Sequence, residues 1–125
     1  MSRVVHFEIL AQDPEQAAKF YRTVFGWEIS AWEGPQPYWL ATTGPDHARG
    51  INGAIMGRQF SQPVINTVVV ESLEACRDEI VKNGGTLAHG PHDIPGIGRH
   101  AYFEDPQGVM FGVLQPLAMG SPAGR

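Results

Sequence analysis

The chain has 125 residues and a formal net charge of −4, and its nine Lys and Arg are scattered rather than clustered. A chain of this length can bury a core without disulfides or metals, and scattered cations do not make the basic surface that nucleic acid needs. The N-terminus lacks the basic and apolar regions of an export signal, and no apolar stretch is long enough to cross a membrane. We therefore expect a cytoplasmic protein with a single domain over residues 1–120, a flexible tail over 118–125, and no nucleic-acid or membrane partner.

The first predicted element is a strand over residues 4–10, in which apolar residues alternate with His6 and Glu8. Successive side chains of a strand point to opposite faces of the sheet. One face of this strand is therefore expected to enter a core, while the other carries two titratable groups.

A helix is predicted next, because Asp13 can cap it, Pro14 suits its first position and Gly26 ends it. Apolar residues recur within it at spacings of three and four, which is typical of a helix with one buried face. We expect these side chains to enter the core: Ala17, Phe20, Tyr21, Val24 and Phe25.

A second helix is predicted after Ser72, ending at Gly84 and Gly85, and Cys76 on its apolar face is expected to be a buried thiol rather than a nucleophile. Turn residues separate the remaining predicted strands. These strands cover residues 27–32, 38–43, 51–56, 64–70, 86–89, 99–104 and 109–115. The order of elements is βαβββ followed by βαβββ.

A shift of 59 residues relates the two halves, since it takes Asp13 to Ser72 and Gly26 to Gly85. The modules cover about residues 3–57 and 63–116. Each contains one helix, which can cover only one face of its sheet. The predicted fold class is therefore α+β, with two tandem βαβββ modules forming a curved mixed sheet around a central cleft.

Three segments and this duplicated order resemble the vicinal oxygen chelate superfamily, which includes glyoxalases, bleomycin-resistance proteins and dioxygenases. The segments are HFEILAQDPEQAAKFYRTVFGWEI, INGAIMGR and VESLEACRDEIVKNGGTLAHGPHDIPGIGRHAYFEDPQGVMFGVLQP. The resemblance covers roughly residues 3 to 117 and implies a glyoxalase-like fold. In the metal-dependent members, four ligands from the first and last strands of the two modules hold one divalent ion.

The resemblance places these four ligand positions at His6, Gly53, Ile65 and Gly112. A single imidazole does not provide the three or four donors that a divalent ion needs. We therefore expect no metal and no other cofactor, and metal-dependent glyoxalase I or extradiol dioxygenase activity is disfavoured. His6 is retained as a pocket residue.

Alternation along the strands predicts a mostly apolar ligand pocket with a few polar groups, which suits a small organic compound. Its expected residues are His6, Glu8, Ile51, Ile55, Thr67, Val69, His100, Tyr102, Met110 and Leu114. The stretch LAHGPHDIPGIG, which contains His89 and His92, is expected to form a loop over the pocket mouth, and His47 is expected at the surface.

Three functions remain open on these residues. The chain is a binding protein for a small, largely apolar compound, or a metal-independent lyase or isomerase on a small carbonyl compound with Glu8 as base, or an interaction module. Against catalysis stands a simpler reading, in which Glu8 is solvated and His100 and Tyr102 lie on an exposed rim. The sequence does not decide whether a reaction is catalysed. The resemblance to the superfamily, whose members often pair, implies a homodimer.

Overall fold

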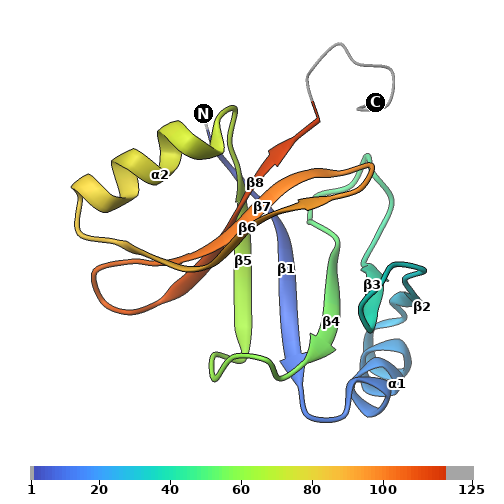
Figure 1. The fold of residues 1–125 in the computed structure, drawn as a ribbon. Helices are drawn as coiled ribbons and strands as arrows, with labels where there is room; N and C mark the ends of the chain where they lie inside the picture. The colour runs from blue at the N-terminus through green and yellow to red at the C-terminus, as the bar shows by residue number, and fades with distance from the viewer. Residues whose placement is uncertain (1, 118–125) are drawn as a thin grey trace. The chain divides into compact units, whose positions relative to one another are not determined.

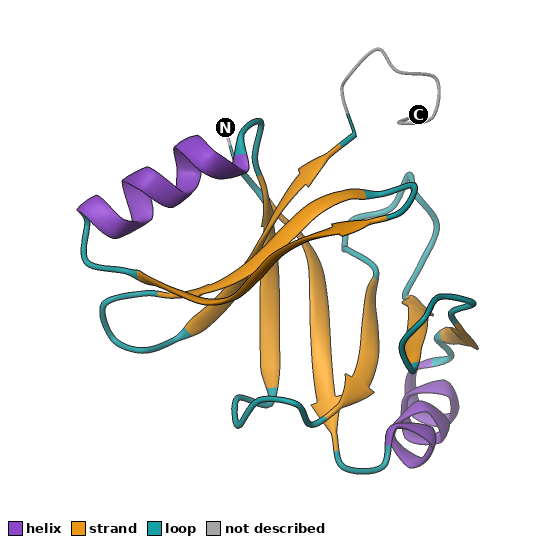
Figure 2. Ribbon diagram, viewed as in Figure 1, coloured by secondary structure: helices purple, strands orange, loops and turns teal. Residues whose placement is uncertain are grey.

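The computed structural model describes residues 2–117, which form two compact units (Figure 1). The first unit is Val5–Asn66, and the second is residues 2–4 together with residues 67–117. Each unit contains one helix and a set of strands (Figure 2). The α+β fold class and the tandem βαβββ order are confirmed. Within residues 2–117, no helix is both long and apolar enough to cross a membrane.

The elements of the first half begin with strand β1 and helix α1, and three further strands follow. Their bounds are β1 Val4–Ala11, α1 Pro14–Phe25, β2 Glu28–Ala31, β3 Tyr38–Thr42 and β4 Gly53–Gly57. The strand order is β2-β3-β4-β1. Strand β1 pairs with β4 in parallel, whereas the other neighbours are antiparallel.

The second half repeats this arrangement. Its elements are β5 Val64–Val69, α2 Leu73–Lys82, β6 Thr86–Ile94, β7 Gly98–Glu104 and β8 Met110–Pro116. The strand order is β5-β8-β7-β6, with β5 and β8 parallel and the other pairs antiparallel. In each half the first and last strands are the parallel pair, and the helix and two further strands lie between them in the chain.

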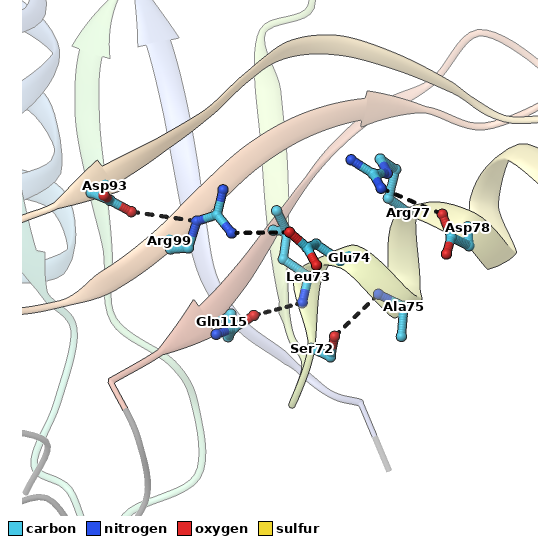
Figure 3. Close-up of polar contacts among 9 residues, drawn as sticks. All are labelled: Ser72, Leu73, Glu74, Ala75, Arg77, Asp78, Asp93, Arg99 and Gln115. Atoms are coloured by element: carbon cyan, nitrogen blue, oxygen red, sulfur yellow. Dashed lines mark hydrogen bonds and ion pairs between the residues drawn. The ribbon is translucent and has the colours of Figure 1, made fainter.

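Both helices are capped as the sequence predicts. The Asp13 carboxylate accepts a hydrogen bond from Gln16 N at 3.1 Å, and Gly26 ends α1 with a left-handed φ of 73°. In α2, Ser72 Oγ accepts from Ala75 N at 3.1 Å (Figure 3). These contacts satisfy amide groups that a helix start leaves without intrahelical partners.

A further contact ties the start of α2 to the sheet of its own unit. Leu73 N donates to Gln115 Oε1 on β8 at 2.8 Å (Figure 3). The Leu73 side chain is 1 % exposed and belongs to the core between α2 and the sheet. The same residue is therefore fixed by a backbone hydrogen bond and by apolar burial.

Helix α1 contacts its sheet through a different set of residues from the set expected. Ala18 is buried and Tyr21 stacks on Trp27 with ring centroids 4.9 Å apart. Phe20, Val24 and Phe25 are 55 %, 53 % and 61 % exposed, so the expectation that they enter the core is wrong. Small side chains let a helix approach a sheet closely, and the adjacent alanines therefore set the contact line while the larger residues lie to its side.

The core of the second unit lies between α2 and β7–β8. Phe103 is fully buried there, and Cys76 contributes as a partly buried thiol whose pKa is raised by burial. An apolar environment favours the neutral thiol over the thiolate. The structural role expected for Cys76 agrees with this placement.

The stretch after Thr86 is a strand rather than a loop. Strand β6 runs to Ile94 and pairs with β7, with register shifts between Leu87 and His89 and between His89 and His92. The Gly and Pro residues that suggested a loop are accommodated at these irregularities, where the regular ladder is interrupted. The expected loop over a pocket mouth is therefore corrected to the outer strand of the second unit.

Two phenylalanines of opposite burial test this description of the cores. Phe103→Ala removes a fully buried ring and should lower the free energy of unfolding by about 3–5 kcal/mol. Phe20→Ala, at a site 55 % exposed, should cost much less. Urea denaturation followed by circular dichroism measures both, and equal losses would contradict the assignment of the core.

Candidate functional site

The sheet of the first unit has two chemically different faces. Ile9, Ile55 and Trp39 lie side by side on paired strands and contact the core around α1. Glu8 is paired with Ala54, which is paired with Leu40, so this row lies on the opposite face. Alternation along the strands thus turns Glu8 away from the helix of its own unit.

Three polar side chains form a hydrogen-bonded chain within the first unit. Tyr38 Oη donates to Glu8 Oε2 at 2.7 Å, and Tyr38 Oη also lies 2.8 Å from His6 Nε2. The His6 and Tyr38 rings are close to parallel, at an interplanar angle of 13°. Tyr38, which opens β3, therefore links the two titratable residues of β1.

Burial governs the electrostatics of these hydrogen-bonded side chains. Glu8 is 5 % exposed, so the reading of it as a solvated strand-edge carboxylate is wrong. Burial lowers the pKa of His6, and the nearby Glu8 charge opposes this by raising it. Desolvation disfavours the imidazolium, and His6 is therefore held as a neutral imidazole next to a carboxylate.

The sequence identified His6 and Glu8 but missed Tyr38. Its side chain is separated from theirs by 30 or more residues along the chain. Alternation alone places Tyr38 on one face of β3, but which face depends on its pairing with Met56 of β4. Only the strand register brings the phenol to Glu8.

In the second unit, six predicted pocket residues share the face opposite α2. Pairing aligns Thr67 with Gly112, Val69 with Leu114, and His100 with the same Leu114. Tyr102 and Met110 belong to this face by alternation along β7 and β8. His100 and Tyr102 are each 7 % exposed, so the expectation of an exposed rim is wrong.

Two polar side chains of this face lie close to Gly112. A Cβ at that position would lie 2.8 Å from His100 Nε2 and 2.9 Å from Thr67 Oγ1. Thr67 Oγ1 is buried and has no hydrogen-bond partner within residues 2–117. Gly112 therefore lets an imidazole and a hydroxyl lie against the backbone of β8, in a space that a side chain would fill.

Ile55, Gly53 and Ile51 do not lie where the sequence placed them. Ile55 is fully buried on the α1 side of its sheet, so its assignment to the pocket is wrong. Gly53 pairs with Phe7 and lies on that same side, and the residue next to Glu8 is Ala54. Ile51 precedes β4 and is 37 % exposed. A one-residue shift exchanges the two faces of a strand.

The superfamily's metal site does not fit these residues. The observed register puts Ala54, rather than Gly53, at the ligand position of β4. The four expected positions therefore hold one imidazole, a methyl group, an isoleucine side chain and a glycine. Divalent ions need several nitrogen, oxygen or sulfur donors in a defined geometry. Nowhere in residues 2–117 are three or more His, Cys, Asp or Glu side chains grouped so as to hold a metal ion.

The histidines of β6 lie next to those of β7. The His92 ring centroid is 5.6 Å from that of His100 and 5.9 Å from that of His89. His89 also lies beside Tyr102. These rings extend the aromatic character of the Gly112 face onto the exposed strand, whereas His47 is exposed at the surface, as expected.

A separate hollow of about 370 Å³ lies at the end of the β6–β7 hairpin. Its polar groups already serve the structure. Arg99 forms ion pairs with Glu74 at 3.7 Å and Asp93 at 3.4 Å, and Gln115 accepts from Leu73 N (Figure 3). The hollow contains none of the predicted pocket residues, so the hydrogen-bonded chain of the first unit is the stronger candidate site.

Sequence comparison finds similarity to proteins with bleomycin-resistance and glyoxylase names. A family described as "Bleomycin resistance protein-like N-terminal" matches residues 3–36. A Mycobacterium bovis protein named "Putative glyoxylase CFP32" is 30 % identical over 115 residues, and the same name and identity apply to a Mycobacterium tuberculosis protein. The match covers 86 % of this chain but 43 % of the relative, so the chain spans less than half the length of these proteins.

Solved structures show the same fold. Methylmalonyl-CoA epimerase in complex with methylmalonyl-CoA and NH4+ has a TM-score of 0.70 at 15 % identity, covering 98 % of this chain and 99 % of that one. The Mycobacterium tuberculosis methylmalonyl-CoA epimerase has a TM-score of 0.66 at 16 % identity, covering 92 % and 88 %. At such identities the likeness establishes the fold alone. The motifs, the duplicated modules and these comparisons together make the chain a member of the vicinal oxygen chelate superfamily.

Proposed function

We propose that the protein binds a small, largely apolar organic compound. The hydrogen-bonded side chains of His6, Tyr38 and Glu8 orient the polar end of this compound. The observation that carries this proposal is a carboxylate that is 5 % exposed and hydrogen-bonded on the sheet face opposite its own helix. Its neighbours on that face, Ala54 and Leu40, are apolar. Apolar walls with a few convergent polar groups are typical of small-molecule sites.

The domain proposed for residues 1–120 carries a second group of proposed pocket residues on one face of the second unit. They are Thr67, Val69, His100, Tyr102, Met110 and Leu114. The buried Thr67 hydroxyl supports a polar contact there, because buried polar atoms are usually paired in a working site. Ile55 is not part of the proposal.

Binding can be tested by a fragment screen observed by NMR, followed by affinity measurements on the best hit. Glu8→Gln keeps the shape of the side chain but removes its charge, and should weaken binding about tenfold or more, since hydrogen bonds to charged groups contribute roughly 1.5–3 kcal/mol. Glu28→Gln, at an exposed position of β2, is the matched control and should leave affinity unchanged. Equal affinities for the two variants would remove Glu8 from the site.

Metal independence is part of the same proposal. Nickel, zinc, manganese and iron(II) should each leave the melting temperature of the purified protein unchanged, because one imidazole provides no defined coordination. Elemental analysis should find far less than one equivalent of metal. A stabilisation by one of these ions that disappears in His6→Ala would show that the ligand set has been misassigned.

A second candidate function is metal-independent proton transfer on a small carbonyl compound, with Glu8 as base. Two observations support it: the contact of Glu8 with the Tyr38 phenol, and the fold shared with methylmalonyl-CoA epimerases. A buried, oriented carboxylate beside a neutral imidazole is an arrangement that general acid–base catalysis uses. The likeness in fold does not transfer the epimerase substrate to this chain.

Solvent deuterium exchange tests this second function directly. The wild type should speed exchange of the acidic C–H of at least one carbonyl compound, with methylmalonyl-CoA included in the panel. Glu8→Gln should slow the catalysed exchange by about 10²–10⁴-fold, the range typical of a lost general base. Exchange that proceeds equally in Glu8→Gln and Glu28→Gln would leave binding as the function.

We also propose that the protein is a cytoplasmic homodimer. The exposed apolar residues of α1, which include Phe20, Val24 and Phe25, support association with a second copy, since soluble monomers rarely expose contiguous apolar patches of large area. Sedimentation equilibrium measures the state of association. A monomer at all concentrations would contradict the dimer without affecting the proposed ligand site.

A further inference from the structure

The hydrogen-bonded chain of the first unit has a direction. A phenol carries a single proton, so Tyr38 Oη can donate only one hydrogen bond while it accepts others. Glu8 Oε2 and His6 Nε2 lie 2.7 Å and 2.8 Å from Tyr38 Oη, both within hydrogen-bonding distance. The ionised Glu8 carboxylate only accepts, and a bond to an ionised acceptor is the stronger of the two choices. The phenol proton therefore belongs to Glu8.

The donor for the other contact must then be His6. With the phenol proton committed to Glu8, the 2.8 Å contact is a hydrogen bond only if His6 Nε2 carries a proton and donates it to Tyr38 Oη. A neutral imidazole has one N–H, so Nδ1 is left as an unprotonated acceptor. His6 Nδ1 makes no hydrogen bond to any group of residues 2–117. The burial that lowers the pKa of His6 is consistent with this neutral form.

We propose that Tyr38 is a specificity-determining residue, which fixes His6 in the Nε2–H form and so makes the ligand-facing groups of the first unit acceptors. Because Glu8 adds a negative charge beside the His6 acceptor, the site selects a ligand whose polar end donates hydrogen bonds, an organic ammonium most strongly. Carboxylates and phosphates are disfavoured. The inference rests on the proposed small-molecule binding and names the class of ligand.

The surrounding contacts support this polarity. The Arg58 guanidinium, just after β4, donates from Nε to the Leu10 carbonyl oxygen at 3.1 Å. The Trp32 and Tyr38 rings are T-shaped, with centroids 5.7 Å apart and an interplanar angle of 69°, so an uncharged ring lies beside the phenol.

The first experiment needs no ligand. Nitrogen-15 NMR of the histidine rings reports which nitrogen carries the proton, and His6 is assigned by comparison with His6→Gln. At pH 7.5 the wild type should show a protonated Nε2 and an unprotonated Nδ1. Tyr38→Phe should lose this preference and give a mixture of the two tautomers, whereas Tyr21→Phe, a control on the α1 side of the same unit, should keep it. A wild-type His6 protonated on Nδ1, or a tautomer unaffected by Tyr38→Phe, would overturn the role of Tyr38.

The second experiment measures selectivity with two probes of equal size and opposite charge, butylammonium and butyrate. Each is titrated at millimolar concentration while the His6 ring signals are followed. Butylammonium should bind about fivefold more tightly than butyrate or better, and Tyr38→Phe should bring this ratio close to one. Tighter binding of butyrate, or equal binding of both probes to the wild type, would overturn the proposed polarity.

The two experiments separate this inference from the proposed function. If the tautomer result holds but neither probe moves the His6 signals while a neutral fragment does, small-molecule binding stands and the ammonium preference fails. If no fragment and no probe binds, both the ligand class and the proposed function fail. Tyr38 would then remain an internal link between His6 and Glu8.

Discussion

The site depends on one geometric constraint: a four-stranded sheet with a single helix has one covered face, and the period of two along each strand decides which residues it receives. In the first unit this rule sends Ile9 and Ile55 to α1 and turns Glu8 to the other face. A charged residue on that second face must still find a partner when it is buried. Tyr38 provides one, and the hydrogen-bonded chain follows from the alternation of β1 together with the placement of β3 beside β4.

Local signals in the sequence predicted the elements well, whereas quantities that depend on pairing were predicted less well. Asp13, Ser72 and Gly26 marked the helix ends correctly, because capping is a property of a few adjacent residues. The face of β4 was predicted incorrectly because a shift of 59 residues relates Glu8 to Thr67, but their partners Ala54 and Gly112 are 58 apart. One residue of difference exchanges the two faces of a strand, and no local pattern reveals it.

Two other errors have the same origin in tertiary structure. Apolar spacing predicted a broad buried face on α1, but the contact line is set by Ala18 and Tyr21, and Phe20 lies outside it. The Gly and Pro residues before Ile94 predicted a loop, yet β7 provides a partner that holds them as an irregular strand. Propensity ranks local choices, and a neighbouring strand or helix can override them.

Equivalent positions of the two halves carry different chemistry. The strand pairs make Tyr38 in the first half correspond to His100 in the second. Tyr38 and Leu10 share a pairing partner on β4, and His100 and Val69 share one on β8. Leu10 and Val69 occupy equivalent positions of the two halves. In the first half the phenol reaches a carboxylate and completes a chain of hydrogen bonds. In the second, the imidazole lies over Gly112 beside a buried hydroxyl that has no partner within residues 2–117. A glycine is required there, because any Cβ would lie closer than 3 Å to both side chains. The same framework thus places a satisfied polar chain in one half and an unsatisfied donor in the other, and an unsatisfied buried hydroxyl is stabilised when a ligand atom pairs with it.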